Sequence, residues 1–183
     1  HTKQKIKDID AEKLFNSICK YAHGSGDPGL FFIDEGNLYN PVEERMLGTN
    51  PCGEEILRSG ESCNLIAINL NNFYKDEKID WERLNKIIRL ALHFGDNVIS
   101  KQYYPLEKSQ KATLETRKIG LGYMGFADLL IKMKIPYNSQ GAVDNCEKLY
   151  ENLALISWKE SLELAKKNGS YPMFDKKIMT NIF

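Results

Sequence analysis

Apolar residues recur at the spacing of an amphipathic helix in several stretches of the chain. Residues 80–104 show this pattern most clearly, because Asp80 can cap a helix whose buried face repeats every three to four residues. That face comprises Leu84, Ile87, Ile88, Ala91 and Leu92. The same period predicts helices over residues 10–25 and 142–168, with Gly169 as the stop of the second.

Shorter apolar stretches predict two strands. Residues 30–36, "LFFIDEG", form a brief apolar run between turn signals, which favours a buried strand. Residues 62–73, "SCNLIAINLNNF", place alternate side chains on opposite faces, which is typical of a second strand. Residues 116–135 indicate a short strand or loop that leads into a helix ending before Pro136.

The segment between the two predicted strands has no clean period. It covers residues 37–55 and predicts a long loop, a kind of segment that is often functional in a compact domain. The order helix, strand, long loop, strand and then helices predicts an α/β domain. Two or three strands are too few for a sheet that stands alone, so we expect further structure to complete it.

The composition is that of an ordinary globular domain. Of the 183 residues, 42% are hydrophobic and 27% are charged, and Lys+Arg and Asp+Glu both number 25. The resulting net charge of zero argues against nucleic-acid binding, which needs an excess of cations. No apolar run reaches the roughly 18–20 residues of a membrane span, and no secretory signal opens the chain. We therefore expect a cytoplasmic protein that binds neither nucleic acid nor a membrane.

Four cysteines stand at positions 19, 52, 63 and 146. In a reducing compartment such residues are more often core, metal-binding or redox-active than disulfide-bonded. No Cys-x-x-Cys or His-x-x-x-His spacing is present, so no zinc site is expected. Cys19 and Cys146 fall on apolar helix faces, and we interpret both as buried core residues.

The stretch "TNPCGEE", residues 49–55, places a thiol between an amide and a carboxylate. A proline before Cys52 and a glycine after it predict a sharp turn that exposes the thiol. Asn50, Cys52 and Glu54 alternate to the same side of such a backbone and can converge on one small molecule. Glu55 points to the opposite side and is interpreted as solvated or structural.

A carboxylate beside a thiol disfavours the thiolate form by like-charge repulsion. A thiolate nucleophile needs a histidine or another cationic neighbour instead, and none is close in the sequence, so a thiol hydrolase is disfavoured. A neutral thiol beside a base suits a different reaction, in which the sulfur donates or accepts a hydrogen atom while Glu54 moves a proton.

Three motifs together resemble the catalytic subunit of ribonucleotide reductase. They are "NPCGEE" followed by "ESCNLIAINL", "GDPGLFFID", and "TRKIGLGYMGFADLL", and the resemblance runs from about residue 10 to residue 174. The Asn-x-Cys-x-Glu pattern with a second cysteine in "ESCNL" is highly specific. The wording Asn-Pro-Cys-Gly-Glu is similar to the adenosylcobalamin-dependent class, which implies that cofactor for this chain.

The resemblance implies a role for each matching residue. Cys52 would form a transient thiyl radical that removes the 3′ hydrogen of a ribonucleotide, most often a diphosphate. Glu54 would accept the 3′-hydroxyl proton, Asn50 would hold the substrate hydroxyls, and Ser62 would also contact substrate. Cys63 would be one of two thiols that reduce the 2′ position and end as a disulfide. A thioredoxin- or glutaredoxin-type reductant would then restore the thiols.

The resemblance also implies a fold. The whole enzyme would be a ten-stranded α/β barrel, and residues 1–183 would form a single, helix-rich piece of it with a finger loop at about 38–60. In the family the thiol partner of Cys63 lies upstream of the matching region, so we expect the middle of a larger enzyme. The alternative is a non-catalytic or split fragment that needs other segments of the reductase.

The sequence "GLGYMG" at residues 120–125 fits the Gly-x-Gly-x-x-Gly pattern of dinucleotide-binding proteins. That pattern is informative only inside a βαβ unit whose next strand ends in an acidic residue. Here the following helix leads to Pro136 and then to another helix. We therefore interpret the glycines as sites of close packing and disfavour a nicotinamide-dependent dehydrogenase.

Other polar residues have structural interpretations that are at least as good as functional ones. His93 lies within a predicted helix and is expected to be satisfied by a neighbour. Asp34 and Asn37 follow a predicted strand and either face a site or stabilise a turn. Arg117 is expected to pair with Asp128 or with another acidic residue.

Overall fold

The computed structural model describes residues 7–182. Residues 1–6 and 183, which belong to the segment predicted to form a single piece, lie outside the described residues. The helices are α1 Ala11–Ser25, α2 Ile33–Leu38, α3 Trp81–Lys101, α4 Glu107–Thr116, α5 Phe126–Met133, α6 Gln140–Asn168 and α7 Lys176–Ile182. The strands are β1 Gly48–Thr49, β2 Ile56–Leu57, β3 Asn64–Asn69, β4 Tyr74–Lys75, β5 Lys78–Ile79 and β6 Ile119–Met124. A 3₁₀ helix, Leu70–Phe73, follows β3. Among the described residues, no helix combines the length and the apolar character needed to cross a membrane.

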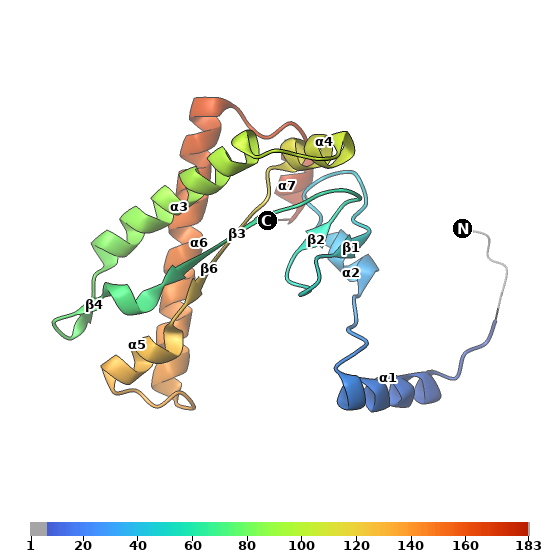
Figure 1. Cartoon of the computed structure of the whole chain (residues 1–183), viewed down its shortest axis with the longest axis horizontal. Coiled ribbons are helices and arrows are strands. Elements are labelled where there is room, and N and C mark those ends of the chain that lie inside the picture. Colours follow the sequence, from blue (N-terminus) through green and yellow to red (C-terminus); the bar gives the residue numbers. More distant parts are fainter. Residues whose placement is uncertain (1–6, 183) are drawn as a thin grey trace.

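A parallel pair of strands, β3 and β6, forms the centre of the fold. The register runs from Asn64 opposite Ile119 to Asn69 opposite Met124. The chain crosses from β3 to β6 through α3 and α4, and the long helix α6 packs against α3 (Figure 1). This arrangement is a βαβ unit, since parallel strands need a crossover connection of this kind.

Only one face of the β3–β6 pair is covered by the described residues. Ile68 is buried in a cluster with residues of α3, α5 and α6, whereas Leu65 and Ala67 on the opposite face are exposed. The cluster comprises Ile68, Leu70, Phe73, Leu84, Ile88, Leu129, Leu149, Leu153 and Ile156. The alternation predicted for residues 62–73 is therefore confirmed over β3, and the open face is what a segment of a larger sheet presents.

The predicted helices over 80–104 and 142–168 are confirmed as α3 and α6. Asp80 caps α3, its carboxylate accepting the Arg83 N–H at 3.0 Å. Gly169 ends α6 with a φ of 87°, a backbone conformation that favours glycine. The helix predicted before Pro136 is α5.

The strand predicted at residues 30–36 is wrong, because Ile33–Leu38 form helix α2. Short apolar runs do not distinguish strand from helix, and here the acidic Asp34 and Glu35 occupy the first helical turn, where they favour the dipole. Helix α4 was not predicted, since residues 107–116 are mostly polar. One face of α4 packs against the segment before β3. The buried Thr113 of this face accepts a hydrogen bond from the Ser62 N–H.

The interpretation of two cysteines as core residues also needs correction. Cys19 is exposed on α1, a helix without a buried residue that lies apart from the other elements (Figure 1). Cys146 on α6 is only partly buried. Helical periodicity identified the apolar face of α1 correctly, but periodicity does not show whether the described chain supplies a partner for that face.

Candidate active site

The predicted loop is built on a short antiparallel hairpin. Strands β1 and β2 pair with Gly48 opposite Leu57 and Thr49 opposite Ile56. The N–H of Gly53 donates to the Asn50 carbonyl at 3.1 Å, and the φ of Gly53 is 81°, so the chain turns sharply at the predicted place. The thiol of Cys52 is exposed on this turn.

Two of the predicted site residues meet on this turn. Asn50 Nδ2 donates to Glu54 Oε1 at 2.5 Å, and Asn50 Oδ1 accepts the Glu55 N–H at 3.1 Å. The amide and the carboxylate therefore flank Cys52 and face each other, which supplies a polar pair beside an exposed thiol. Glu55 instead forms an ion pair with Lys118 at 3.4 Å, which confirms its structural interpretation.

Cys63 and Ser62 lie directly before β3. Burial raises the pKa of the Cys63 thiol, and the carboxylates of Glu55 and Glu54 raise it further. The thiol of Cys63 is therefore neutral near pH 7 and lies within the electrostatic reach of the loop that carries Cys52. The hydroxyl of Ser62 is 3.0 Å from that of Thr113 on α4, so this side chain already has a protein partner.

A buried polar cluster lies at the base of the loop. The side chains of Arg58 and Glu61 are 3% and 0% exposed and form an ion pair at 3.5 Å. Arg58 also donates to Glu44 at 2.5 Å and to the Ala112 carbonyl at 2.8 Å, and it pairs with Glu115 at 3.3 Å. The guanidinium therefore joins the loop to α4.

The charges within this cluster satisfy one another. Burial by itself would raise the pKa of Glu61, but hydrogen bonds from Thr116 and from the Arg58 N–H, together with the charge of Lys118, bring it below its ordinary value. Burial would lower the pKa of Arg58, but Glu44 and Glu61 outweigh that effect and raise it. Both groups are therefore ionised at neutral pH.

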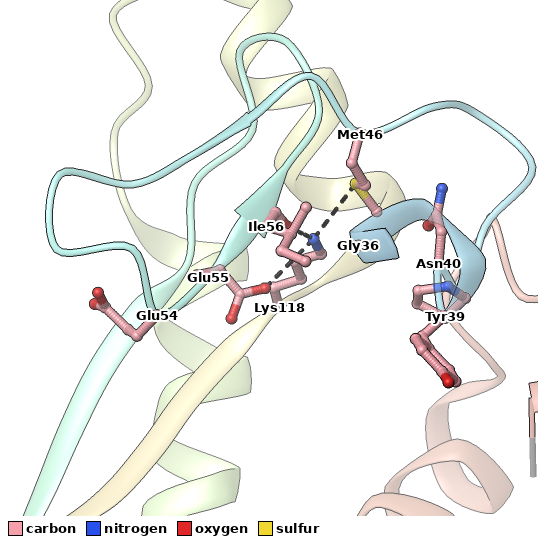
Figure 2. Close-up of a pocket in the computed structure, with 9 residues that line it drawn as sticks. Gly36, Tyr39, Asn40, Met46, Glu54, Glu55, Ile56 and Lys118 are labelled. Carbon is pink, nitrogen blue, oxygen red and sulfur yellow. Dashed lines mark hydrogen bonds and ion pairs between the residues drawn. The ribbon is translucent and has the colours of Figure 1, made fainter. Parts of the chain in front are cut away.

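Lys118 extends the cluster toward the turn. It lines a pocket of about 270 Å³ together with residues of the loop, among them Glu54, Glu55 and Ile56 (Figure 2). Sequence reasoning missed Arg58, Glu61 and Lys118. One signal in the sequence could have indicated a cation from elsewhere in the chain. Residues 54–61 contain three carboxylates, Glu54, Glu55 and Glu61, but only one cation, Arg58, and carboxylates that become buried need a paired cation.

The alternative interpretations can be compared with the same structure. A βαβ unit is present, but Gly120 and Gly122 lie within its second strand, and no strand follows α5 in residues 126–182. A Cβ on Gly120 would lie 2.6 Å from the Leu65 side chain, and Gly125 begins α5 against the Asn69 amide with a φ of 71°. Gly120 and Gly125 therefore serve close packing, as predicted, whereas a Cβ on Gly122 would meet no atom within 4 Å. The dinucleotide-binding geometry is absent from the described part of the chain.

The remaining polar candidates have structural partners. His93 Nε2 lies 2.6 Å from Glu160 Oε1, so the histidine is satisfied by a neighbour, as predicted. Arg117 pairs with Asp96 at 2.7 Å, the second of the two predicted possibilities. Asn37 bonds the backbone of Met46 at 2.8 and 3.1 Å and thereby holds the loop to α2.

Known proteins resemble this chain over nearly its whole length. The family described as "Ribonucleotide reductase, barrel domain" matches residues 1–182. A vitamin B12-dependent ribonucleoside-diphosphate reductase of Thermoplasma acidophilum is 45% identical over 174 residues, which cover 93% of this chain and 23% of that protein. The similarly named protein of Mycobacterium tuberculosis (strain CDC 1551 / Oshkosh) is 43% identical over 171 residues, which cover 92% and 25%.

A solved structure shows the same fold. The class Id ribonucleotide reductase alpha subunit of Actinobacillus ureae superposes with a TM-score of 0.75 at 25% identity, over 88% of this chain and 33% of that one. The chain therefore spans about a quarter of the length of each of the two relatives and a third of the length of the solved subunit. The βαβ unit with one open sheet face is accordingly part of an α/β barrel, and the chain belongs to the ribonucleotide reductase barrel-domain family.

Proposed function

We propose that this chain is the segment of a ribonucleoside-diphosphate reductase that carries the radical cysteine. The observation that supports the proposal most directly is the turn at Asn50–Glu55, where an amide and a carboxylate bond each other at 2.5 Å beside an exposed thiol. The names of the relatives supply the reaction and the substrate class, since both are vitamin B12-dependent ribonucleoside-diphosphate reductases.

Each side chain has a defined task in this proposal. The thiyl radical of Cys52 takes the 3′ hydrogen of the ribose, and Glu54 accepts the proton of the 3′-hydroxyl. Asn50 holds the substrate hydroxyls through its amide. The hydrogen bond between Asn50 and Glu54 keeps both groups oriented before substrate arrives, which reduces the cost of reaching the reactive geometry.

Cys63 acts at the next stage. It is one of two thiols that supply two electrons for replacing the 2′-hydroxyl by hydrogen, and the hydroxyl leaves as water while the thiols form a disulfide. The raised pKa of Cys63 keeps its proton available for transfer at neutral pH. Ser62 orients this segment through its hydrogen bond with the Thr113 hydroxyl. A hydroxyl can make more than one hydrogen bond, and the Ser62 hydroxyl uses a further one to contact substrate.

The proposed cofactor is adenosylcobalamin, whose chemistry when bound is to supply the radical that takes the hydrogen atom from a thiol. The exposed Cys52 fits this role because a large group can approach it from outside the turn. The pocket of about 270 Å³ beside Glu54 lies below the ~300–1,000 Å³ of typical ligand pockets. The main cofactor contacts are therefore assigned to other parts of the enzyme.

The wider setting follows from this assignment. We assign residues 1–183 to one piece of the catalytic barrel, with the finger loop at about 38–60. The reaction takes place in the cytoplasm, contributes deoxyribonucleotides for DNA synthesis, and depends on a thioredoxin- or glutaredoxin-type dithiol to reduce the disulfide.

Turnover of the assembled enzyme that contains this chain tests the proposal. With ribonucleoside diphosphates, adenosylcobalamin and a dithiol reductant, we expect formation of deoxyribonucleoside diphosphates. A complete enzyme that forms none under these conditions would contradict the proposed function.

A second candidate is a fragment that is inactive until other segments dock. The exposed Leu65 and Ala67 on the open face of β3–β6 favour it, because this face needs a cover. Turnover by residues 1–183 in isolation would refute this candidate, whereas turnover only after the other segments are added would support it.

Replacement of Cys63 by serine is expected to stop multiple turnover supported by a dithiol. The serine hydroxyl cannot join a disulfide, so the electrons for the 2′ position cannot be delivered repeatedly. Product formed per enzyme in the presence of a dithiol reductant measures this effect. Cys146→Ser serves as the matched control, since Cys146 lies on α6, outside the proposed site, and its replacement should leave repeated turnover intact.

A further inference from the structure

The strand register places Lys118 beside Cys63. Asn64 is opposite Ile119 in the parallel β3–β6 pair, so the residues that precede them, Cys63 and Lys118, enter the pair side by side. Lys118 therefore lies between the Cys63 segment, which leads into β3, and the hairpin that carries the proposed radical residue Cys52.

The ammonium group of Lys118 contacts both the Cys52 hairpin and the segment that precedes Cys63. Its Nζ donates to the carbonyl of Ile56 in β2 and lies 3.4 Å from Glu55 Oε1, both on the return side of the hairpin (Figure 2). It also lies 3.2 Å from Glu61 Oε2, two residues before Cys63. The side chain is 15% exposed, so these interactions take place largely away from solvent.

The charge of Lys118 also acts on Cys63 itself. Burial and the carboxylates of Glu55, Glu54 and Glu61 raise the pKa of the thiol, and Lys118 opposes them. Lys118 thus opposes the effect of the three carboxylates on the Cys63 thiol, while Glu61 is also paired with Arg58.

We propose that Lys118 is a positioning residue of the reductase. Its ammonium group binds both the Cys52 hairpin and the Cys63 segment, and it thereby fixes the distance between the thiols of Cys52 and Cys63. This inference rests on the proposed function. Lys118 touches neither substrate nor the reacting atoms in the proposal, and it acts through Glu55, Ile56 and Glu61. Displacement of a reacting group by about 1 Å can cost roughly 100-fold in rate, so a tie at this point is effective.

The test uses Lys118→Met and Lys118→Gln in the assembled enzyme that contains this chain. We expect kcat to fall by about 10- to 100-fold in Lys118→Met. We also expect the pH profile of Cys63 alkylation, followed by mass spectrometry of the labelled peptide, to shift to higher pH. The shift has this sign because the Lys118 charge opposes the effect of Glu54, Glu55 and Glu61 on the thiol, and its loss removes that opposition. Lys118→Gln keeps a donor for the Ile56 carbonyl but loses the charge, so the profile should shift in this variant even where Lys118→Met does not fold.

Two further variants make the result specific. Lys118→Arg restores the cation and should recover most of the turnover and a profile close to that of the unmodified enzyme. Lys132→Met is the matched control, because Lys132 also donates to a backbone carbonyl, that of Asn71 at 3.1 Å, but lies on α5 away from the loop. It should change neither measurement.

An unchanged alkylation profile in both neutral variants would overturn the inference, as would a kcat for Lys118→Met equal to that of the unmodified enzyme. The two hypotheses fail separately. An enzyme that reduces no ribonucleotide refutes the proposed function, whereas the alkylation profile of Cys63 reports on Lys118 without any turnover.

Discussion

Replacement of Cys52 by alanine is expected to abolish ribonucleotide reduction and to leave substrate binding nearly unchanged. The thiol is the only group on the Asn50–Glu55 turn that can carry a hydrogen atom, so its loss removes the chemical step. Removal of the residue that performs the chemistry in other enzymes costs roughly 10⁴-fold or more in kcat, and we expect a loss of that size.

Binding should be much less affected, because Asn50 and Glu54 remain in place. Their hydrogen bond of 2.5 Å does not involve the sulfur, and Gly53 keeps the turn sharp. Loss of one neutral contact is worth about 0.5–1.5 kcal/mol, which corresponds to a change in Kd of about tenfold or less.

Single-turnover product analysis and equilibrium binding of a ribonucleoside diphosphate separate the two effects. Cys19→Ala is the matched control, since Cys19 is also exposed but lies on α1, outside the loop. Reduction at an ordinary rate by the Cys52→Ala enzyme would contradict the mechanism. A loss of binding equal to the loss of turnover would show that Cys52 organises the loop and does not carry the radical.

The sequence contained enough information for the main helices, the β3 strand and the geometry of the turn. Helices α3 and α6 were predictable because they bury one continuous apolar face, and the pattern of β3 because one face of the strand is covered. The turn at Asn50–Glu54 was predictable because its conformation depends on neighbouring residues, a proline and a glycine, and not on distant contacts.

Features that depend on distant contacts were not predictable in this way. Helix α2 formed where a strand was expected, since an apolar run of four residues fits either element. Helix α4 formed from mostly polar residues because it packs against the loop. The guanidinium of Arg58 donates to the Ala112 carbonyl of this helix at 2.8 Å. These residues are 54 positions apart in the chain, and no local pattern indicates that they meet.

The same limit applies to the site. Local spacing brought together Asn50 and Glu54, but it did not indicate that Lys118 would enter the fold beside Cys63. That neighbourhood arises from the parallel register of β3 and β6, which requires the whole crossover through α3 and α4. The residues proposed to perform the chemistry were therefore visible as a motif, whereas the residues proposed to hold them in place were visible only in the folded structure.

Arg58 offers the clearest measure of how strongly the loop is held. Arg58→Met keeps most of the side-chain volume but removes the charge from a site where Arg58 is 3% and Glu61 is 0% exposed. Loss of one partner from a buried ion pair costs about 3–5 kcal/mol. We expect the lower end of that range, because Lys118 stays 3.2 Å from Glu61 and still offsets its charge.

Hydrogen exchange at the hairpin amides in the assembled enzyme measures this loss locally, which avoids assuming two-state unfolding of a large protein. A loss of about 3 kcal/mol should speed exchange of the Leu47 and Glu55 N–H groups by roughly 100-fold. Arg89→Met is the matched control: Arg89 also pairs with a glutamate at 3.5 Å, but it is 48% exposed and bridges α3 to α6. Glu160 keeps its partner His93 at 2.6 Å when Arg89 is replaced, and the change lies between α3 and α6, so it should not alter exchange in the hairpin. Equal exchange rates in the two variants would mean that the β1–β2 hairpin keeps its place without Arg58, and that the loop is held by β-pairing and Lys118 instead.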